Sequence, residues 1–313
     1  MSIRILPQPA AKPTAAEYIM SDELRNAVEV AIALEQPLLL TGEPGTGKTR
    51  LAYKVAADLA AQKGDLSFAE TPLIFNTKTT SVARDLFYTY DALAHFQAAN
   101  VRKTEQLDTA EFIDLQAFGK AIALTNPQGV DGKRFKTDLG KTARSSVVLI
   151  DEIDKAPRDF PNDILSEIER YEFQIKEQDG YTVRRDDKQR VVVIMTSNSE
   201  KNLPDAFLRR CVFYHIPFPD EQMLLSIAKT QLGRATKYTD DLLKELIDYF
   251  QNVRQQAVRK PPATAELVAW LRMLEMREVM NVTAEQRKGK LRDHLSVLVK
   301  TKEDLDAVRG LFG

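Results

Sequence analysis

The chain is poor in the residues that build disulfide frameworks and metal centres. Among its 313 residues are one cysteine, Cys211, and three histidines. A single cysteine excludes an intrachain disulfide and favours a reducing compartment such as the cytoplasm. The histidines show no metal-ligand spacing, so with only one cysteine beside them the sequence argues against a zinc site.

Long apolar runs and a charge of one sign are absent too. No run approaches the ~18 residues that a membrane-spanning helix needs. The first 13 residues hold three prolines and lack the apolar centre of a signal peptide. The 44 basic and 45 acidic residues nearly cancel, so bulk charge gives no argument for nucleic acid or an anionic membrane. With 43% apolar and 28% charged residues, the composition is that of an ordinary globular protein.

What is present is a change of pattern near residue 217. Before it, short apolar runs predict strands at residues 38–40, 72–75, 147–150, 191–195 and 212–216, and helical spacing predicts helices at 21–35, 50–61 and 82–101. After it, only helices are predicted, at 220–232, 239–256, 264–280 and 283–300. We therefore expect an irregular arm at 1–15, an α/β domain at 16–218 and a helical domain at 219–313. Within the α/β domain, residues 77–146 resemble an insertion and 171–185 a β-hairpin.

A glycine-rich loop follows the first predicted strand. The segment from Gly42 to Thr49 has the form Gly-x-x-x-x-Gly-Lys-Thr, with a helix predicted after it. Glycines let backbone N–H groups converge on phosphate oxygens, and the helix adds its positive end. In this pattern Lys48 reaches the β- and γ-phosphates, and the Thr49 hydroxyl ligates Mg²⁺. The expected nucleotide-binding residues are Gly42, Glu43, Pro44, Gly45, Thr46, Gly47, Lys48, Thr49 and Arg50.

Polar side chains end two later strands. The strand at 147–150 runs into Asp151, a candidate Mg²⁺ ligand, and Glu152, a candidate base for an attacking water. Such a pair is often only a strand end meeting solvent, but the glycine loop upstream favours the catalytic interpretation. After the strand at 191–195, Asn198 is placed either to bond the γ-phosphate or the water, or to cap a turn.

Two arginines follow, Arg209 and Arg210. An arginine at a subunit edge can stabilise the charge of a transition state in the neighbouring subunit. On their own the two residues are equally consistent with a solvated basic pair. The basic stretch at 131–144, with five basic and two acidic residues, is either a solvated loop or a polyanion contact.

In this order, these elements resemble the AAA+ ATPases. The glycine loop matches Walker A, residues 150–152 match Walker B, Asn198 matches sensor 1, and Arg209 and Arg210 stand at the arginine finger. Residues 148–163, 80–93 and 260–267, together with Trp270, look like the MoxR-type branch of that superfamily. The resemblance implies a parallel sheet of strand order 5-1-4-3-2 followed by a smaller all-α lid.

The resemblance also implies an activity. Members hydrolyse ATP with Mg²⁺ and usually form hexameric rings. They often act as chaperone-like remodellers of a partner complex or insert metals or cofactors, and many work with a partner that carries a von Willebrand factor A domain. Arg210 is the better finger candidate, because relatives often have aspartate at Arg209. Relatives carry the sensor 2 arginine where this chain has residues 261–263, which include none, so Lys260, Arg259 or Arg254 would have to replace it. The hairpin would point to the ring pore or be a plain surface feature.

Two other activities fit the same core. A nucleic-acid motor or loader would need a basic groove or an added DNA-binding element, and the sequence shows neither. A regulatory switch would bind ATP without turning it over, but the residue types needed for hydrolysis are all present.

Overall fold

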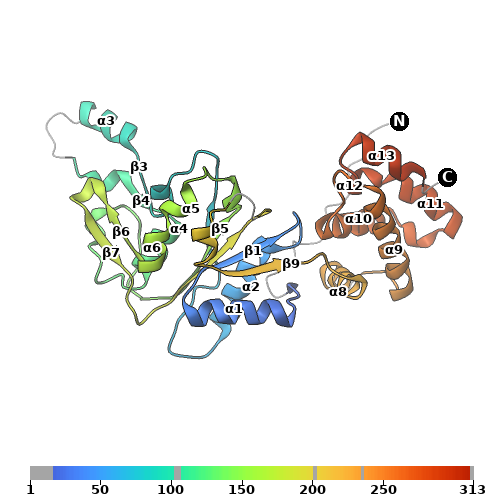
Figure 1. Cartoon of the computed structure of the whole chain (residues 1–313), viewed down its shortest axis with the longest axis horizontal. Coiled ribbons are helices and arrows are strands. Elements are labelled where there is room, and N and C mark those ends of the chain that lie inside the picture. The colour runs from blue at the N-terminus through green and yellow to red at the C-terminus, as the bar shows by residue number, and fades with distance from the viewer. Residues whose placement is uncertain (1–16, 102–106, 200–202, 234–235, 311–313) are drawn as a thin grey trace. The chain divides into compact units, whose positions relative to one another are not determined.

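The computed structural model describes residues 17–101, 107–199, 203–233 and 236–310, so the expected arm at 1–15 lies outside the described residues (Figure 1). Contacts divide the chain into two compact units. The sheet unit comprises Met20–Gly42 and Lys48–His215, and the helical unit comprises Met1–Ile19, Glu43–Gly47 and Ile216–Gly313. The short glycine-loop segment Glu43–Gly47 thus groups with the helices rather than with the rest of the expected 16–218 domain.

A five-stranded parallel sheet forms the centre of the sheet unit, in the order β2-β5-β8-β1-β9. Its strands are β1 (Leu38–Gly42), β2 (Leu73–Asn76), β5 (Ser146–Asp151), β8 (Val191–Thr196) and β9 (Val212–Ile216). Numbered along the chain, this order is 5-1-4-3-2, which confirms the expected fold. The inner strands are buried along almost their whole length, because helices cover both faces.

Helices on the two faces of this sheet are α1 (Asp22–Leu34) and α2 (Lys48–Ala61) on one side, and α4 (Ala117–Leu124), α5 (Phe160–Asp163) and α6 (Leu165–Arg170) on the other (Figure 1). The core on the second side takes alternate strand residues, such as Val148 and Ile150 of β5. Period-2 alternation sends the intervening residues of β5 to the other face, where α2 contacts it. The short α7 (Asp205–Leu208) follows β8.

The expected helix at 82–101 is wrong in its first half. Residues Ala83–Leu86 form a 3₁₀ turn, and Tyr88–Tyr90 form β3, which pairs antiparallel with β4 (Ile113–Leu115). Only Ala92–Val101 is helical, as α3. The pairing of β3 with a strand more than twenty residues away buries Tyr88, and this tertiary contact overrides the local helical spacing.

Helix α4 was not predicted. Seven of its eight residues are buried, all except Lys120. A helix that is apolar all round shows no amphipathic period. The hairpin is confirmed, with β6 (Glu172–Ile175) antiparallel to β7 (Tyr181–Arg184).

The helical unit holds α8 (Glu221–Leu232), α9 (Asp240–Gln256), α10 (Thr264–Met276), α11 (Ala284–Asp293), α12 (Leu295–Leu298) and α13 (Lys302–Arg309). Its core surrounds the fully buried Trp270. The helix expected at 264–280 ends early, because Glu278 adopts a left-handed conformation. The helix expected at 283–300 is interrupted at His294. None of the described helices is long and apolar enough to cross a bilayer.

Candidate nucleotide-binding site

The glycine loop has the backbone that its sequence predicts. Gly45 and Gly47 have φ angles of 81° and 90°, a left-handed region that favours glycine. Within the helical unit, a Cβ on Gly45 would lie 3.0 Å from the Cβ of Ala263, and one on Gly47 would lie 3.0 Å from the ring of Tyr18. Both positions therefore need glycine for conformation and for space.

Lys48 begins α2, and its side chain is buried in the sheet unit. Its exposed fraction is 8%, and its ammonium donates to the carbonyl of Gly42 at 2.7 Å and to Oδ1 of Asn198 at 3.0 Å. The backbone N–H of Asn198 in turn donates to Asp154 at 3.2 Å. Two predicted site residues that are 150 positions apart thus lie in direct contact. Arg50 is the third residue of the same helix and is half-buried.

The residues expected to hold Mg²⁺ also meet. The Thr49 hydroxyl lies 3.0 Å and 3.2 Å from the two carboxylate oxygens of Asp151. No group of three or more potential metal-binding side chains of the types His, Cys, Asp and Glu occurs in the described part of the chain. A single carboxylate with a hydroxyl nonetheless fits Mg²⁺, which is usually bound through one or two carboxylates plus substrate phosphates and water.

Glu152 occupies a strained turn at the end of β5. Its φ and ψ are 56° and 51°, a left-handed conformation that is unusual for glutamate. Its carboxylate forms an ion pair with Lys155, and both side chains are about half exposed, at 42% and 50%. The hydrogen bond from Lys155 to Glu152 raises the pKa of that lysine. The candidate base therefore faces solvent with a cation beside it.

Arg209 and Arg210 do not join this cluster. Arg209 is exposed at the end of α7. Arg210 donates to Glu169 of α6 at 2.5 Å and to the carbonyl of Ala206 at 3.1 Å.

The three cationic residues proposed for sensor 2 have different contacts within the helical unit. Lys260 is exposed, and its backbone N–H donates to Asp304. Arg259 pairs with Glu303. Arg254 donates to the Glu43 carboxylate of the glycine loop at 2.6 Å, with its guanidinium 3.7 Å from the ring centre of Phe218.

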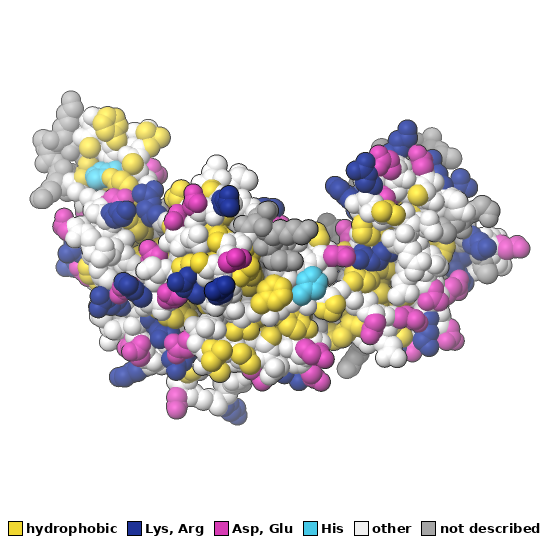
Figure 2. Space-filling view, viewed as in Figure 1, with side chains coloured by type: hydrophobic (Ala, Val, Ile, Leu, Met, Phe, Trp, Pro, Cys, Tyr) yellow, Lys and Arg dark blue, Asp and Glu magenta, His cyan; other side chains and the backbone are white. Residues whose placement is uncertain are grey.

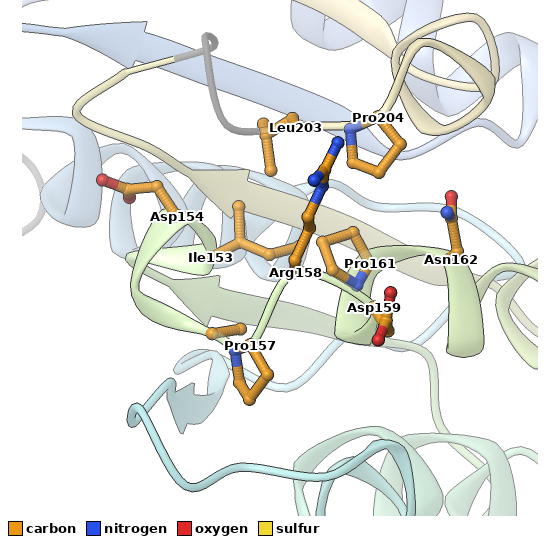
Figure 3. Close-up of a pocket in the computed structure, with 10 residues that line it drawn as sticks. Ile153, Asp154, Pro157, Arg158, Asp159, Pro161, Asn162, Leu203 and Pro204 are labelled. Atoms are coloured by element: carbon orange, nitrogen blue, oxygen red, sulfur yellow. The ribbon is translucent and has the colours of Figure 1, made fainter.

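A cavity of about 550 Å³ opens beside the acidic strand end, but it is not the phosphate site. None of the predicted site residues lines it. Figure 3 shows Arg158 reaching toward Leu203 and Pro204, while Asp154 lies at the left of the view and Asn162 at the right.

The basic stretch at 131–144 is partly neutralised. Arg134 pairs with Asp131 at 3.1 Å and Lys136 with Asp114 at 3.7 Å. On the face shown in Figure 2, basic and acidic side chains of the sheet unit are interspersed. The stretch therefore has the character of a solvated loop more than of a polyanion contact.

Sequence reasoning missed three residues that touch the cluster. Thr196 contacts both acidic residues, Asp154 holds the backbone of Asn198, and Lys155 pairs with Glu152. The signal for Thr196 was a polar residue at the end of an otherwise apolar strand that neighbours the acidic one.

Comparisons with known proteins now bear on this geometry. A comparison with curated proteins finds no significant match. Similar solved structures include one from a study of katanin self-assembly, 13% identical, covering 96% of this chain and 90% of that one, with a TM-score of 0.45. Another is PCH-2 of C. elegans, 18% identical, covering 92% of this chain and 65% of that one, with a TM-score of 0.39. These similarities are too low to bear on function.

The family comparison is decisive. A model described as the AAA domain of the dynein-related subfamily matches residues 37–211, which is more than half of the chain. The matched region contains the glycine loop, both acidic residues, Asn198 and both arginines. The chain therefore belongs to the AAA domain family, dynein-related subfamily, a family of ATPases.

Proposed function

We propose that the protein is a ring-forming ATPase of the MoxR-type branch, which hydrolyses ATP to remodel a partner protein. One observation carries the ATP-hydrolysing part of the proposal. The sheet unit brings the Thr49 hydroxyl to within 3.2 Å of the Asp151 carboxylate and the Lys48 ammonium to within 3.0 Å of Asn198. These residues come from three separate strand ends and match the chemistry of a nucleoside triphosphate with its magnesium ion.

Each residue has a distinct task in this proposal. Lys48 and the loop N–H groups of Gly42–Gly47 hold the phosphates, while Thr49 and Asp151 ligate the metal ion. When bound, Mg²⁺ neutralises charge that develops on the phosphates. Glu152 accepts a proton from the attacking water, which general-base catalysis accelerates by about 10²–10⁴-fold. Asn198 orients that water or the γ-phosphate.

The finer parts of the proposal rest on the resemblance. They are a hexameric ring, Arg210 acting on the neighbouring subunit's nucleotide, a von Willebrand factor A partner, metal or cofactor insertion, and a cytoplasmic location. For sensor 2, we assign Arg254 in place of Lys260, because Arg254 alone of the three candidates contacts a glycine-loop side chain in the described structure.

The test compares two variants of the full chain in steady-state ATPase and equilibrium ATP-binding assays. Lys48→Ala loses binding, since the phosphates lose their main cation. Glu152→Gln keeps binding but turns over at least about 100-fold more slowly, since the amide cannot accept the proton. Near-normal turnover by Glu152→Gln would refute the assignment of Glu152 as the general base. A wild-type chain that binds ATP but does not hydrolyse it would instead be a regulatory switch.

A further inference from the structure

We propose that Thr196 is a positioning residue that holds the metal ligand and the base of the ATPase site through one hydroxyl group. This inference rests on the proposed ATPase function and adds to it a buried residue that acts through Asp151 and Glu152. Thr196 is the last residue of β8 and is 1% exposed.

Strand pairing places this hydroxyl beside the acids. β5 and β8 are parallel, with Ile150 opposite Met195, so the next residues along, Asp151 and Thr196, also lie side by side. The Thr196 hydroxyl donates to Oδ1 of Asp151 at 2.5 Å and accepts from the backbone N–H of Glu152 at 2.8 Å. A hydroxyl has one hydrogen, and the amide can only donate, so the direction of both bonds is fixed.

The first bond orients the carboxylate of Asp151. The same Oδ1 also accepts from Thr49, at 3.0 Å. Thr196 therefore anchors, from a buried position, the same carboxylate that Thr49, the second expected metal ligand, contacts. Hydrogen bonds to a ligating carboxylate set its orientation, and removing such a partner costs about 10–100-fold in metal affinity or activity.

The second bond supports the turn that carries Glu152. The left-handed conformation of this residue persists only where its surroundings hold it. The bond from its N–H to Thr196 is one such restraint, and it fixes the direction in which the chain leaves β5. One side chain thus acts on the metal ligand and on the base at the same time.

The test uses Thr196→Val, which removes the hydroxyl at similar size, and Thr196→Ser, which keeps it. Thr125→Val is the matched control. Thr125 is also 1% exposed, and its hydroxyl likewise makes two bonds, donating to the carbonyl of Ile122 at 2.6 Å and accepting from the N–H of Asp186 at 2.9 Å. It lies at the end of α4, outside the site.

Two readouts separate positioning from stability. The first is kcat and KM for ATP. The second is the affinity for a non-hydrolysable ATP analogue with and without Mg²⁺, measured by calorimetry. We expect Thr196→Val to lower kcat by about 10–100-fold and to lose most of the Mg²⁺-dependent gain in affinity. Thr196→Ser should restore both, and Thr125→Val should leave both unchanged even if its Tm falls equally.

The opposite result is equally clear. If Thr196→Val melts like Thr125→Val but keeps wild-type kcat and the full Mg²⁺ effect, Thr196 is only structural. Thr196→Ala removes the same hydroxyl and replaces Thr196→Val if that variant does not fold; wild-type values for it would overturn the inference too. A wild-type chain that neither binds the analogue nor hydrolyses ATP would refute the proposed function itself.

Discussion

At the residue scale, Asp304 shows how one carboxylate organises a loop of the helical unit. It is 3% exposed and accepts from the backbone N–H groups of Arg259 and Lys260, at 2.9 Å and 3.0 Å, and from the hydroxyl of Thr301 at 2.7 Å. Burial raises the pKa of Asp304, but the hydrogen bonds outweigh it and hold the pKa below its ordinary value of 3.8. The ionised form is therefore the one that the fold stabilises.

This shift sets the sign of a pH effect. Because the folded pKa is depressed, the unfolded chain takes up the proton at higher pH than the folded chain does. The stabilisation is complete above the ordinary aspartate pKa and is lost as the pH falls below it, toward the folded value. We expect Asp304→Asn to have a lower Tm at neutral pH and a flatter decline of Tm below about pH 4. Melting curves across pH measure this.

Asp306→Asn is the control for that experiment. Asp306 lies on the same helix and forms an exposed pair with Arg309, with side chains 53% and 55% exposed. Exposed pairs contribute little, so its melting curves should follow the wild type. If the Tm of Asp304→Asn and that of the wild type fell equally steeply below about pH 4, the role given to Asp304 would be contradicted.

Among single site residues, the sequence predicted those whose partners follow from strand order. Lys48, Thr49, Asp151 and Asn198 stand at strand ends of one parallel sheet, so their meeting could be expected. Arg254 could only be named as one of three sensor 2 candidates, because its contact with Glu43 joins a helix and a loop that are 211 positions apart. No local pattern encodes that pairing.

At the element scale, the predictions held where one physical cause dominates. The inner strands β1, β5 and β8 were found because burial on both faces gives unbroken apolar runs, and α1, α8 and α9 because capping residues mark their starts. The helix expected at 82–101 is wrong in its first half because β3 forms through a non-local pairing with β4. Helix α4 was missed because burial on all sides removes the amphipathic period from its sequence.

In the missed helix α4, a close contact decides whether a glycine-to-alanine substitution stabilises or destabilises the fold. Glycine in a helix interior normally costs about 1 kcal/mol relative to alanine. At Gly119, however, a Cβ would lie 2.1 Å from the backbone oxygen of Phe87. We expect Gly119→Ala to destabilise the fold, since backbone atoms cannot move aside as a flexible side chain can.

Gly289 of α11 is the matched position, with nothing within 4 Å of its Cβ. Gly289→Ala should raise the free energy of unfolding by up to about 1 kcal/mol. Urea denaturation of both variants measures the contrast. Equal effects of the two substitutions would show that α4 does not pack against Phe87 as closely as the structure has it.

At the scale of the whole molecule, the role proposed for Arg210 depends on a second subunit. In the isolated chain it pairs with Glu169, and the two side chains are 45% and 50% exposed. An ion pair this open is weak, so in the proposed ring the nucleotide of a neighbouring subunit would compete for the guanidinium at little cost. A finger that acts on a neighbour requires a head-to-tail interface, the kind that closes into a ring.

Mixing two inactive variants tests this sharing directly. Arg210→Ala keeps the base but lacks the finger, and loss of such an arginine costs about 10³–10⁵ in kcat. Glu152→Gln keeps the finger but lacks the base. If sites are shared, an equal mixture of the two variants regains activity. A site is active where an Arg210→Ala subunit supplies Glu152 and its Glu152→Gln neighbour supplies Arg210. Random assembly into a head-to-tail ring places this pair at about one quarter of the sites. Arg209→Ala alone should stay active. A mixture as inactive as its components would place Arg210 outside the catalytic site of the neighbouring subunit.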